Sequence, residues 1–213
     1  MRLASAERAR RQRLLPADRR LQIIEAATRL IGERGFWGVS VHDIAAVCGI
    51  TDAGLLHHFG TKDALLIAVL ERRDKVDDES LAERLGIPAQ ELYEAVRHLP
   101  LTEVCAAVVA RNAEQPEIVR LYSVLNAESL IATHPAYDYF QAREARVIAF
   151  FGSARSDLHA DPAVRGREVI AMMDGLQLRW LRDPEQVDLV ADWANLFGAA
   201  AAQRSRDASG ESR

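Results

Sequence analysis

The sequence is poor in cysteine and contains no long hydrophobic run. Its two cysteines, Cys48 and Cys105, lie far apart, which argues against a disulfide framework and against the paired spacing of a zinc site. No apolar segment approaches the roughly 20 residues that cross a bilayer. The first twenty residues are rich in arginine but lack the apolar stretch of a secretory signal. These absences predict a cytoplasmic protein without a membrane partner.

Catalytic motifs and strand patterns are also missing. There is no sustained period-two alternation of apolar and polar residues, so a sheet is not expected. A glycine-rich phosphate loop, a nucleophile elbow and a zinc-hydrolase HExxH motif are all absent. His134 and Asp138, four residues apart near a predicted helix start, are the one pair worth considering as catalytic. Local capping and surface pairing explain that pair better, so no catalytic site and no cofactor are predicted.

Charge is distributed unevenly along the chain. Residues 1–75 hold 13 Lys and Arg against 9 Asp and Glu, whereas residues 76–213 hold 14 against 22. Seven arginines fall within the first twenty residues, including Arg8, Arg10, Arg11 and Arg13. A basic N-terminal part joined to an acidic body suggests that one end meets a polyanion. The alternative is a solvated arm without a partner, and composition alone does not decide between the two.

Helical periodicity covers nearly the whole chain, and prolines mark the joints. Pro116, Pro135, Pro162 and Pro184 are each expected near the first position of a helix, with Asp161 and Asp183 as N-caps of the last two. The pattern predicts an all-α fold. The predicted helices are 18–34, 41–48, 52–58, 62–80, 89–98, 102–114, 117–132, 135–157, 162–181 and 185–201.

The segment 35–66, GFWGVSVHDIAAVCGITDAGLLHHFGTKDALL, carries the chemistry. Ser40 and Asp43 form a capping-box pattern at the start of one short helix, and Gly49 is expected to end it. Thr51 can cap a second short helix, and Thr61 can cap the helix that opens with Lys62. Two short helices joined by a tight, glycine-containing turn predict a helix-turn-helix, whose second helix lies in the DNA major groove.

Residues 20–70 resemble the N-terminal domain of TetR (tetracycline-repressor-like) transcription regulators. The matching features are an amphipathic first helix, "RGF", "DIA", the "CGI" turn, "HHF", and "TK" at the start of the fourth helix, in order and at near-fixed spacing. The resemblance implies a three-helix DNA-binding domain at 18–66, after a basic arm at 1–17. It also implies a larger helical ligand-binding and dimerisation domain at 67–202, before a tail at 203–213 that is expected to be disordered.

The resemblance also implies which residues meet DNA. The hydroxyls of Ser40 and Thr51 stand at helix N-termini, where they can hold phosphate oxygens. His42, His58 and Lys62 match positions that face the sugar-phosphate backbone of DNA in the family. The positions expected to read bases are Asp52, Ala53, Gly54 and His57.

Two positions depart from the family pattern. Leu56 stands where the family usually has tyrosine, which removes one phosphate-directed hydroxyl. Asp52 opens the reading helix where a basic or small residue suits DNA better, and its structural role at the helix dipole is the favoured one. A metal site at His57 and His58 is not expected, because adjacent helical residues diverge by about 100° and a metal pair needs spacing three or four.

The C-terminal half is expected to bind a small-molecule effector and a second copy of the chain. The candidate pocket residues are Cys105, Val109, Tyr122, Leu125, Asn126, Met172 and Trp180. The segment 170–181 looks like the dimerising helix of many family members, and the last predicted helix has two apolar stripes on opposite faces, which a homodimer would cover. A helix buried within one chain is the alternative. The predicted dimer contacts are Leu176, Trp180, Leu189, Trp193, Leu196 and Ala200.

These features predict a ligand-responsive repressor that binds a near-palindromic double-stranded operator as a homodimer. The alternative is a protein with the same helical plan that binds a lipid or small molecule and no longer meets DNA. A protein of that kind would be expected to have lost the polar side chains that face the DNA backbone. Ser40, Thr51, His58 and Lys62 are all present, which favours the regulator.

Overall fold

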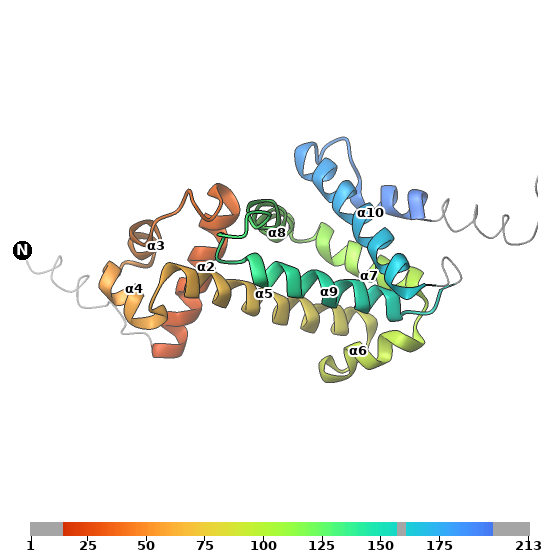
Figure 1. Ribbon diagram of the computed structural model, residues 1–213, viewed down its shortest axis with the longest axis horizontal. Helices are drawn as coiled ribbons and strands as arrows, with labels where there is room; N and C mark the ends of the chain where they lie inside the picture. The colour runs from red at the N-terminus through yellow and green to blue at the C-terminus, as the bar shows by residue number, and fades with distance from the viewer. Residues whose placement is uncertain (1–14, 157–160, 198–213) are drawn as a thin grey trace, which may run out of the picture.

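The computed structural model describes residues 15–156 and 161–197, and these residues are mainly helical. The described residues contain no strand, only an isolated bridge between Pro100 and Arg155. No helix in the described part is long and apolar enough to cross a membrane. The predicted all-α class is confirmed. The elements are α2 (Pro16–Arg34), α3 (Val41–Cys48), α4 (Asp52–Phe59), α5 (Lys62–Leu85), η1 (Ala89–Glu91), α6 (Leu92–Ala95), η2 (Val96–His98), α7 (Leu101–Ala113), α8 (Pro116–Glu128), α9 (Tyr137–Ser153) and α10 (Pro162–Arg182), followed by helical residues 189–197 (Figure 1).

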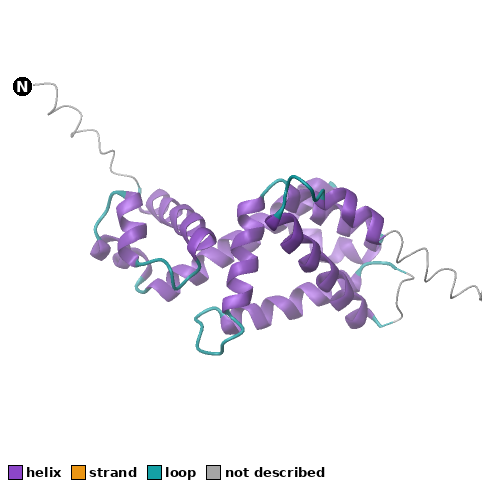
Figure 2. Ribbon diagram, turned by 90° about the horizontal axis from the view of Figure 1, so that it is seen from above, coloured by secondary structure: helices purple, strands orange, loops and turns teal. Residues whose placement is uncertain are grey.

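The molecule is elongated, with a small helical group at one end and a larger one at the other. Helices α2, α3 and α4 cluster at the first end, while α6, α7, α9 and α10 pack at the second (Figures 1 and 2). Helix α5 has 24 residues, which corresponds to a length of about 36 Å, and it runs from one group into the other. It ends five residues later than the predicted position 80 and therefore belongs to both groups.

The N-terminal group has its own hydrophobic core. Ile23, Ala27 and Ile31 of α2 recur at the spacing of one helix face and are almost fully buried. They meet Ile44 of α3 and Leu55 of α4, which are also fully buried. Burial of each isoleucine and leucine contributes about 1.5–3 kcal/mol, so these contacts hold the short α3 and α4 in place. The same core takes Val69 and Leu70 of α5, beyond the predicted domain boundary at 66, and that boundary remains a prediction.

The predicted caps of the short helices are present. The Ser40 hydroxyl accepts the N–H of Asp43 at 3.1 Å, while the Asp43 carboxylate accepts the N–H of Ser40 at 2.8 Å, which completes a capping box. The hydroxyls of Thr51 and Thr61 cap α4 and α5 by accepting the N–H groups of Gly54 and Ala64, both at about 3 Å and without a reciprocal bond. Gly49 ends α3 with φ of 65°, a left-handed conformation that favours glycine.

A second core fills the C-terminal group, where α9 and α10 pack closely. Two glycines allow this approach. A Cβ added to Gly166 would lie 2.2 Å from the backbone oxygen of Ile148, and one added to Gly152 would lie 2.4 Å from that of Pro162. The core otherwise consists of aliphatic and aromatic side chains, among them Cys105, Leu176 and Trp180.

Several predicted helix ends are wrong. Helix α8 ends at Glu128 instead of 132, and α9 begins at Tyr137, two residues after Pro135. The last helix begins at 189, because the carboxylate of Asp188 accepts the N–H groups of Val190 and Ala191, both at 3.0 Å. Asp188 therefore takes the capping role expected of Asp183. Pro116 and Pro162 do open their helices, and Asp161 caps α10 as predicted.

The predicted dimer contacts need correction. Leu176, Trp180, Leu189 and Trp193 are all buried in the core of their own chain, so they are not available to a partner. The buried residues of the last helix are Leu189, Trp193 and Phe197, which recur every four positions and form one buried face. Leu196 is exposed as a dimer contact requires. Ala200, the arm residues before 15 and the tail lie outside the described residues.

Candidate functional site

Helix α4 presents its N-terminal turn to solvent. Asp52 and Ala53 are exposed, while Leu55 and Phe59 anchor the opposite face in the core. The Thr51 hydroxyl accepts the N–H of Gly54 at 3.1 Å, and a Cβ on Gly54 would approach that hydroxyl to 3.2 Å. Because residue 54 is a glycine, no side chain crowds the hydroxyl that caps the helix, and the N-terminal turn of α4 stays accessible.

His42 and Asp52 bridge the starts of α3 and α4. Nδ1 of His42 lies 3.2 Å from Oδ1 of Asp52, and both side chains are largely exposed. The aspartate that looked unfavourable for DNA therefore faces an imidazole that can carry the opposite charge. His42 and Asp52 are ten residues apart in the sequence, on either side of a turn, and this spacing does not predict a contact between them.

Two of the seven arginines in the first twenty residues lie in α2 and bind the ends of the short helices. Arg19 donates to the carbonyl of Cys48 at 3.3 Å, at the C-terminus of α3. Arg20 donates to the carbonyl of His58, and its guanidinium lies 4.2 Å from the centroid of the Phe59 ring. Cations at helix C-termini stabilise the helix dipole. These two arginines thus tie α2 to the ends of α3 and α4, a role that the sequence did not predict.

His57 and His58 lie on the C-terminal turn of α4, with ring centroids 5.8 Å apart. His57 is exposed and His58 half-buried. Burial lowers the pKa of His58, and the neighbouring charges of His57 and Arg20 lower it further. Among the described residues no group of three or more His, Cys, Asp or Glu side chains is placed to hold a metal ion.

Lys62 points inward and not toward solvent. Its Nζ donates to the carbonyl of Phe36 at 2.6 Å and lies 3.9 Å from the centroid of the Phe36 ring. Burial lowers the pKa of Lys62, against the opposing effect of nearby carboxylates. In this structure the lysine links α5 to the turn after α2, so a phosphate contact from Lys62 remains only a prediction.

The same turn is tied to the C-terminal group. The backbone N–H of Phe36 donates to Oε2 of Glu128 at 2.8 Å, at the end of α8. His134 is buried beside it, with its ring 5.3 Å from Phe36 and its Nε2 3.7 Å from Oε2 of Glu128. The carboxylate next to His134 is therefore that of Glu128, at a distance too long for a hydrogen bond, and not that of Asp138, which the sequence suggested.

A cavity of about 550 Å³ lies between α5, α7, α8, α9 and α10. This volume is within the range of small-molecule sites. Its wall carries five carboxylates and three guanidinium groups, together with five aromatic rings. The charged residues are Asp74, Asp77, Asp78, Glu144, Asp174, Arg111, Arg143 and Arg146.

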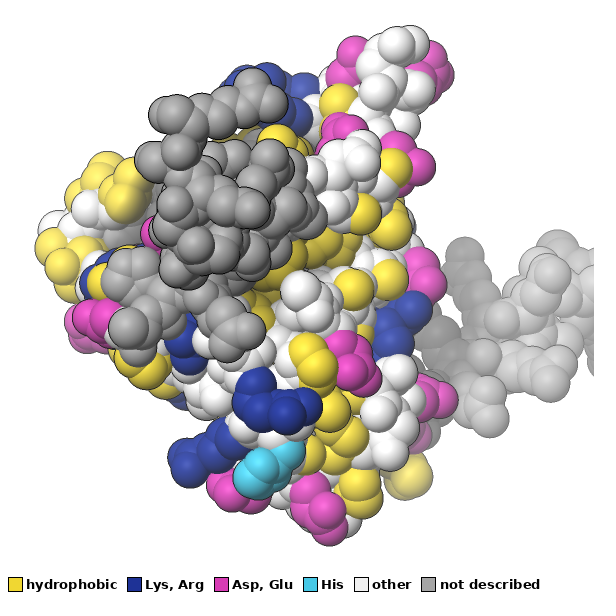
Figure 3. Space-filling view, turned by 90° about the vertical axis from the view of Figure 1, so that its right-hand side faces the viewer, with side chains coloured by type: hydrophobic (Ala, Val, Ile, Leu, Met, Phe, Trp, Pro, Cys, Tyr) yellow, Lys and Arg dark blue, Asp and Glu magenta, His cyan; other side chains and the backbone are white. Residues whose placement is uncertain are grey.

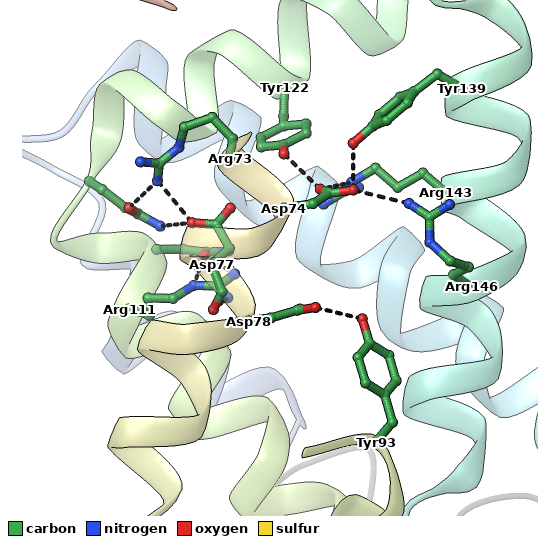
Figure 4. Close-up of polar contacts among 12 residues, drawn as sticks. Arg73, Asp74, Asp77, Asp78, Tyr93, Arg111, Tyr122, Tyr139, Arg143 and Arg146 are labelled. Carbon is green, nitrogen blue, oxygen red and sulfur yellow. Dashed lines mark hydrogen bonds and ion pairs between the residues drawn. The ribbon is translucent and has the colours of Figure 1, made fainter. Parts of the chain in front are cut away.

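Asp74 is the centre of a polar cluster at one side of the cavity (Figure 4). Its carboxylate accepts the Tyr122 hydroxyl at 2.7 Å, Arg143 Nε at 3.1 Å and Arg146 Nη2 at 3.0 Å, and it also accepts the Tyr139 hydroxyl. Burial opposes ionisation, but Arg143 and the two hydroxyls outweigh it and lower the pKa of Asp74. Asp74 thereby connects α5 to α8 and α9.

Most of the predicted pocket residues are core residues instead. Tyr122 and Asn126 line the cavity, and Asn126 is exposed, so it has no need of the buried partner that was expected. Cys105, Val109 and Leu125 are fully buried, because helix packing turns them away from the opening. Met172 and Trp180 also pack against the second core and do not line this cavity. The sequence signal that was missed is the i, i+3, i+4 run Asp74, Asp77 and Asp78 on α5.

Known proteins match both the N-terminal helices and most of the chain. Residues 23–69 match the family model described as bacterial regulatory proteins, tetR family. Over 181 residues the chain is 30% identical to the HTH-type transcriptional regulator PksA of Bacillus subtilis, an alignment that covers 80% of this chain and 82% of PksA. The chain belongs to the TetR family. This TetR family protein is therefore a DNA-binding transcriptional regulator, as its sequence predicted.

Solved structures agree with the TetR fold. A TetR-family regulator from Rhodococcus sp. superimposes with a TM-score of 0.63 at 21% identity, covering 87% of this chain and 99% of that chain. NalD of Pseudomonas aeruginosa, described as the secondary repressor of the MexAB-OprM multidrug efflux pump, has a TM-score of 0.60 at 25% identity and covers 86% and 94%.

Proposed function

We propose that this TetR family regulator represses transcription as a homodimer on a near-palindromic operator, and that a small molecule in the cavity releases it. In this role it works in the cytoplasm, where it meets chromosomal DNA. The proposal rests on a direct structural connection between the cavity and the DNA-binding group. Helix α8 lines the cavity with Tyr122 and Ser123, and its last residue, Glu128, binds the backbone of Phe36 in the DNA-binding group. The likeness to NalD, a repressor, supports the direction of regulation.

The exposed side of α4 is the surface that enters the major groove in this proposal. Ala53 and His57 reach base edges, while Ser40, Thr51 and His58 face the phosphates on either side. A dimer places two such helices about 34–36 Å apart, or a multiple of this, so the operator has two matching half-sites. Phosphate contacts make the affinity fall steeply as salt is raised.

Selection of bound duplexes from a random pool tests DNA recognition. We expect the wild-type protein to enrich a near-palindromic site at low salt. Replacing His57 by glutamate should weaken binding to that site about tenfold or more, because it adds a negative charge against the duplex. His98→Glu, at an exposed position far from α4, is the matched control and should bind as wild type. No enrichment, or equal binding by both variants, would exclude this surface as the reader.

The dimer in this proposal uses the exposed side of the last two helices. Val190 and Leu196 of the last helix are 45% and 49% exposed in the single chain, and Leu178 of α10, which also lines the cavity, is 45% exposed. The end of the molecule opposite α3 and α4 shows hydrophobic side chains grouped between charged ones (Figure 3). Apolar surface of this kind is often covered by a second copy.

The oligomeric state checks this surface. Wild-type protein is expected to have twice the monomer mass by light scattering. Leu196→Glu should shift it toward the monomer, because a carboxylate would be buried without a partner. Ile131 is 65% exposed in the turn after α8, so Ile131→Glu is the control and should leave the dimer intact. A dimer that tolerates Leu196→Glu as well would place the interface elsewhere.

A further inference from the structure

The charges of the cavity indicate what kind of molecule it holds, and this inference rests on the proposed effector role. The three guanidinium groups of the wall are already occupied. Arg143 and Arg146 bind the carboxylate of Asp74 at 3.1 and 3.0 Å. Arg111 donates to the carbonyl of Asp77 at 2.9 Å and to the side chain of Asn112 at 2.9 Å. An anionic ligand would have to displace these contacts.

Three carboxylates of the same wall have no cation bound to them. Asp78 accepts only the Tyr93 hydroxyl, at 2.8 Å. Within the described part of the chain, Glu144 and Asp174 make no hydrogen bond and no ion pair. Arg143 is the cation that acts on Asp174, and it already binds Asp74. Burial raises the pKa of both Asp78 and Asp174, and this effect outweighs the Tyr93 hydrogen bond and the charge of Arg111 at Asp78 and the charge of Arg143 at Asp174.

A buried amide supplies a second, independent observation. Gln177 lines the cavity from α10 and is only 8% exposed. Its side chain makes no hydrogen bond to any described residue. The amide therefore opens onto the cavity, where it is free to exchange hydrogen bonds with a bound molecule. Gln177 lies three residues after Asp174, and residues at that spacing share one face of a helix.

Aromatic rings complete the wall. Tyr93 and Phe150 pack edge to face with centroids 5.6 Å apart, and the Tyr93 hydroxyl is the group that binds Asp78. Phe140 and Phe151 line the cavity as well. Ring faces attract cations, and the attraction is stronger where water is excluded. Rings beside carboxylates that form no ion pair within the described residues suit a ligand that is both apolar and positively charged.

We propose that the cavity binds an organic cation with an apolar body, such as a substituted ammonium or phosphonium ion. The positive charge of this ligand lies near Asp78, Glu144 and Asp174, and its apolar body packs against the aromatic rings. In ligands that carry N–H groups, these donate to the side chain of Gln177. The surplus of carboxylates over guanidinium groups selects the sign of the ligand's charge.

Calorimetry with pairs of probes of opposite charge and similar shape tests the proposal on the full chain. The first pair is tetraphenylphosphonium and tetraphenylborate, and the second, smaller pair is benzyltrimethylammonium and benzenesulfonate. In at least one pair the cation should bind about tenfold or more tightly than its anionic counterpart. Preference for the anion, indifference to charge, or no binding of either cation would overturn the proposal.

Single charge-removing variants locate the binding. At least one of Asp78→Asn, Glu144→Gln and Asp174→Asn should weaken the cation about tenfold. Glu71→Gln is the matched control, since Glu71 is exposed on α5 and does not line the cavity. Cation binding that is equal in all four variants would show that the ion lies elsewhere and would refute the site.

The effector role is measured separately. On the operator obtained by selection, the bound cation is expected to release the protein. If the cation binds through the cavity carboxylates but does not release the protein from the operator, the proposed ligand class stands and the regulatory role of the cation is refuted. Enrichment of no operator would refute the proposed function and leave the calorimetric result unaffected.

Discussion

Replacing Gly166 by alanine is expected to destabilise the protein by about 1–3 kcal/mol. In an exposed helix the same change would stabilise by up to about 1 kcal/mol, because alanine has the higher helix propensity. Here the new Cβ would lie 2.2 Å from the oxygen and 2.9 Å from the carbon of the Ile148 carbonyl. Both atoms belong to the backbone of α9, so the clash is relieved only if the two helices move apart.

Gly32→Ala is the matched control for this prediction. Gly32 also lies in a helix against a neighbouring helix, but its nearest contacts for an added Cβ are at 3.5 Å, an ordinary van der Waals distance. We expect Gly32→Ala to be neutral or to stabilise by about 0.5 kcal/mol. Urea unfolding of both variants gives the two values. If Gly166→Ala were as stable as wild type, α9 and α10 would not be packed as closely as described.

Replacing Asp74 by asparagine is expected to cost about 3 kcal/mol of unfolding free energy. The Asp74 carboxylate accepts from Tyr122, Tyr139, Arg143 and Arg146, and all of these are donors. An asparagine offers one oxygen in place of two and turns an amide N–H₂ toward the remaining donors. It also leaves two guanidinium groups without their counter-charge, and Arg143 is half-buried, with its guanidinium 4.3 Å from the centroid of the Tyr122 ring.

The pH dependence of this cost follows from the direction of the Asp74 shift. Its folded pKa lies below the ordinary value of 3.8, so the carboxylate contributes its full stabilisation above that value. The contribution is lost as the pH falls through the lowered folded pKa. The difference between wild type and Asp74→Asn in chemical unfolding should therefore be constant near neutral pH and should shrink below about pH 4.

Asp78→Asn is the control, on the same helix and four residues later. Burial raises the pKa of Asp78, with the nearby charge of Asp74 adding to it and the Tyr93 hydrogen bond opposing it. The charge of Asp78 is thus less favourable in the folded state than in the unfolded chain, and an asparagine can still accept the Tyr93 hydroxyl. We expect Asp78→Asn to be neutral or slightly stabilising at pH 7. Equal losses in both variants would contradict the central role of Asp74.

Local signals in the sequence were sufficient for the DNA-binding group. The Ser40 and Thr51 caps, the glycine after each short helix and the apolar spacing of α2 act over a few residues, and the structure contains each of them. The bonds from Arg19 and Arg20 to the carbonyls of Cys48 and His58 were not predictable in this way, because 29 and 38 residues separate the partners. Lys62 likewise looked like a surface cation until its contact with Phe36 was seen.

The sequence by itself determined the helical class, the helix-turn-helix and the family, because hydrophobic period, capping and turn residues act within one or two helical turns. Only the tertiary structure decided which apolar residues became core and which faced a cavity. Cys105 and Leu125 have the same local pattern as residues that line the opening, and the packing of α5, α8 and α9 separates them. The pairing of Asp74 and the lack of pairing at Asp174 depend on the same packing, since a charge is neutralised by whatever side chain the fold brings within a few ångströms.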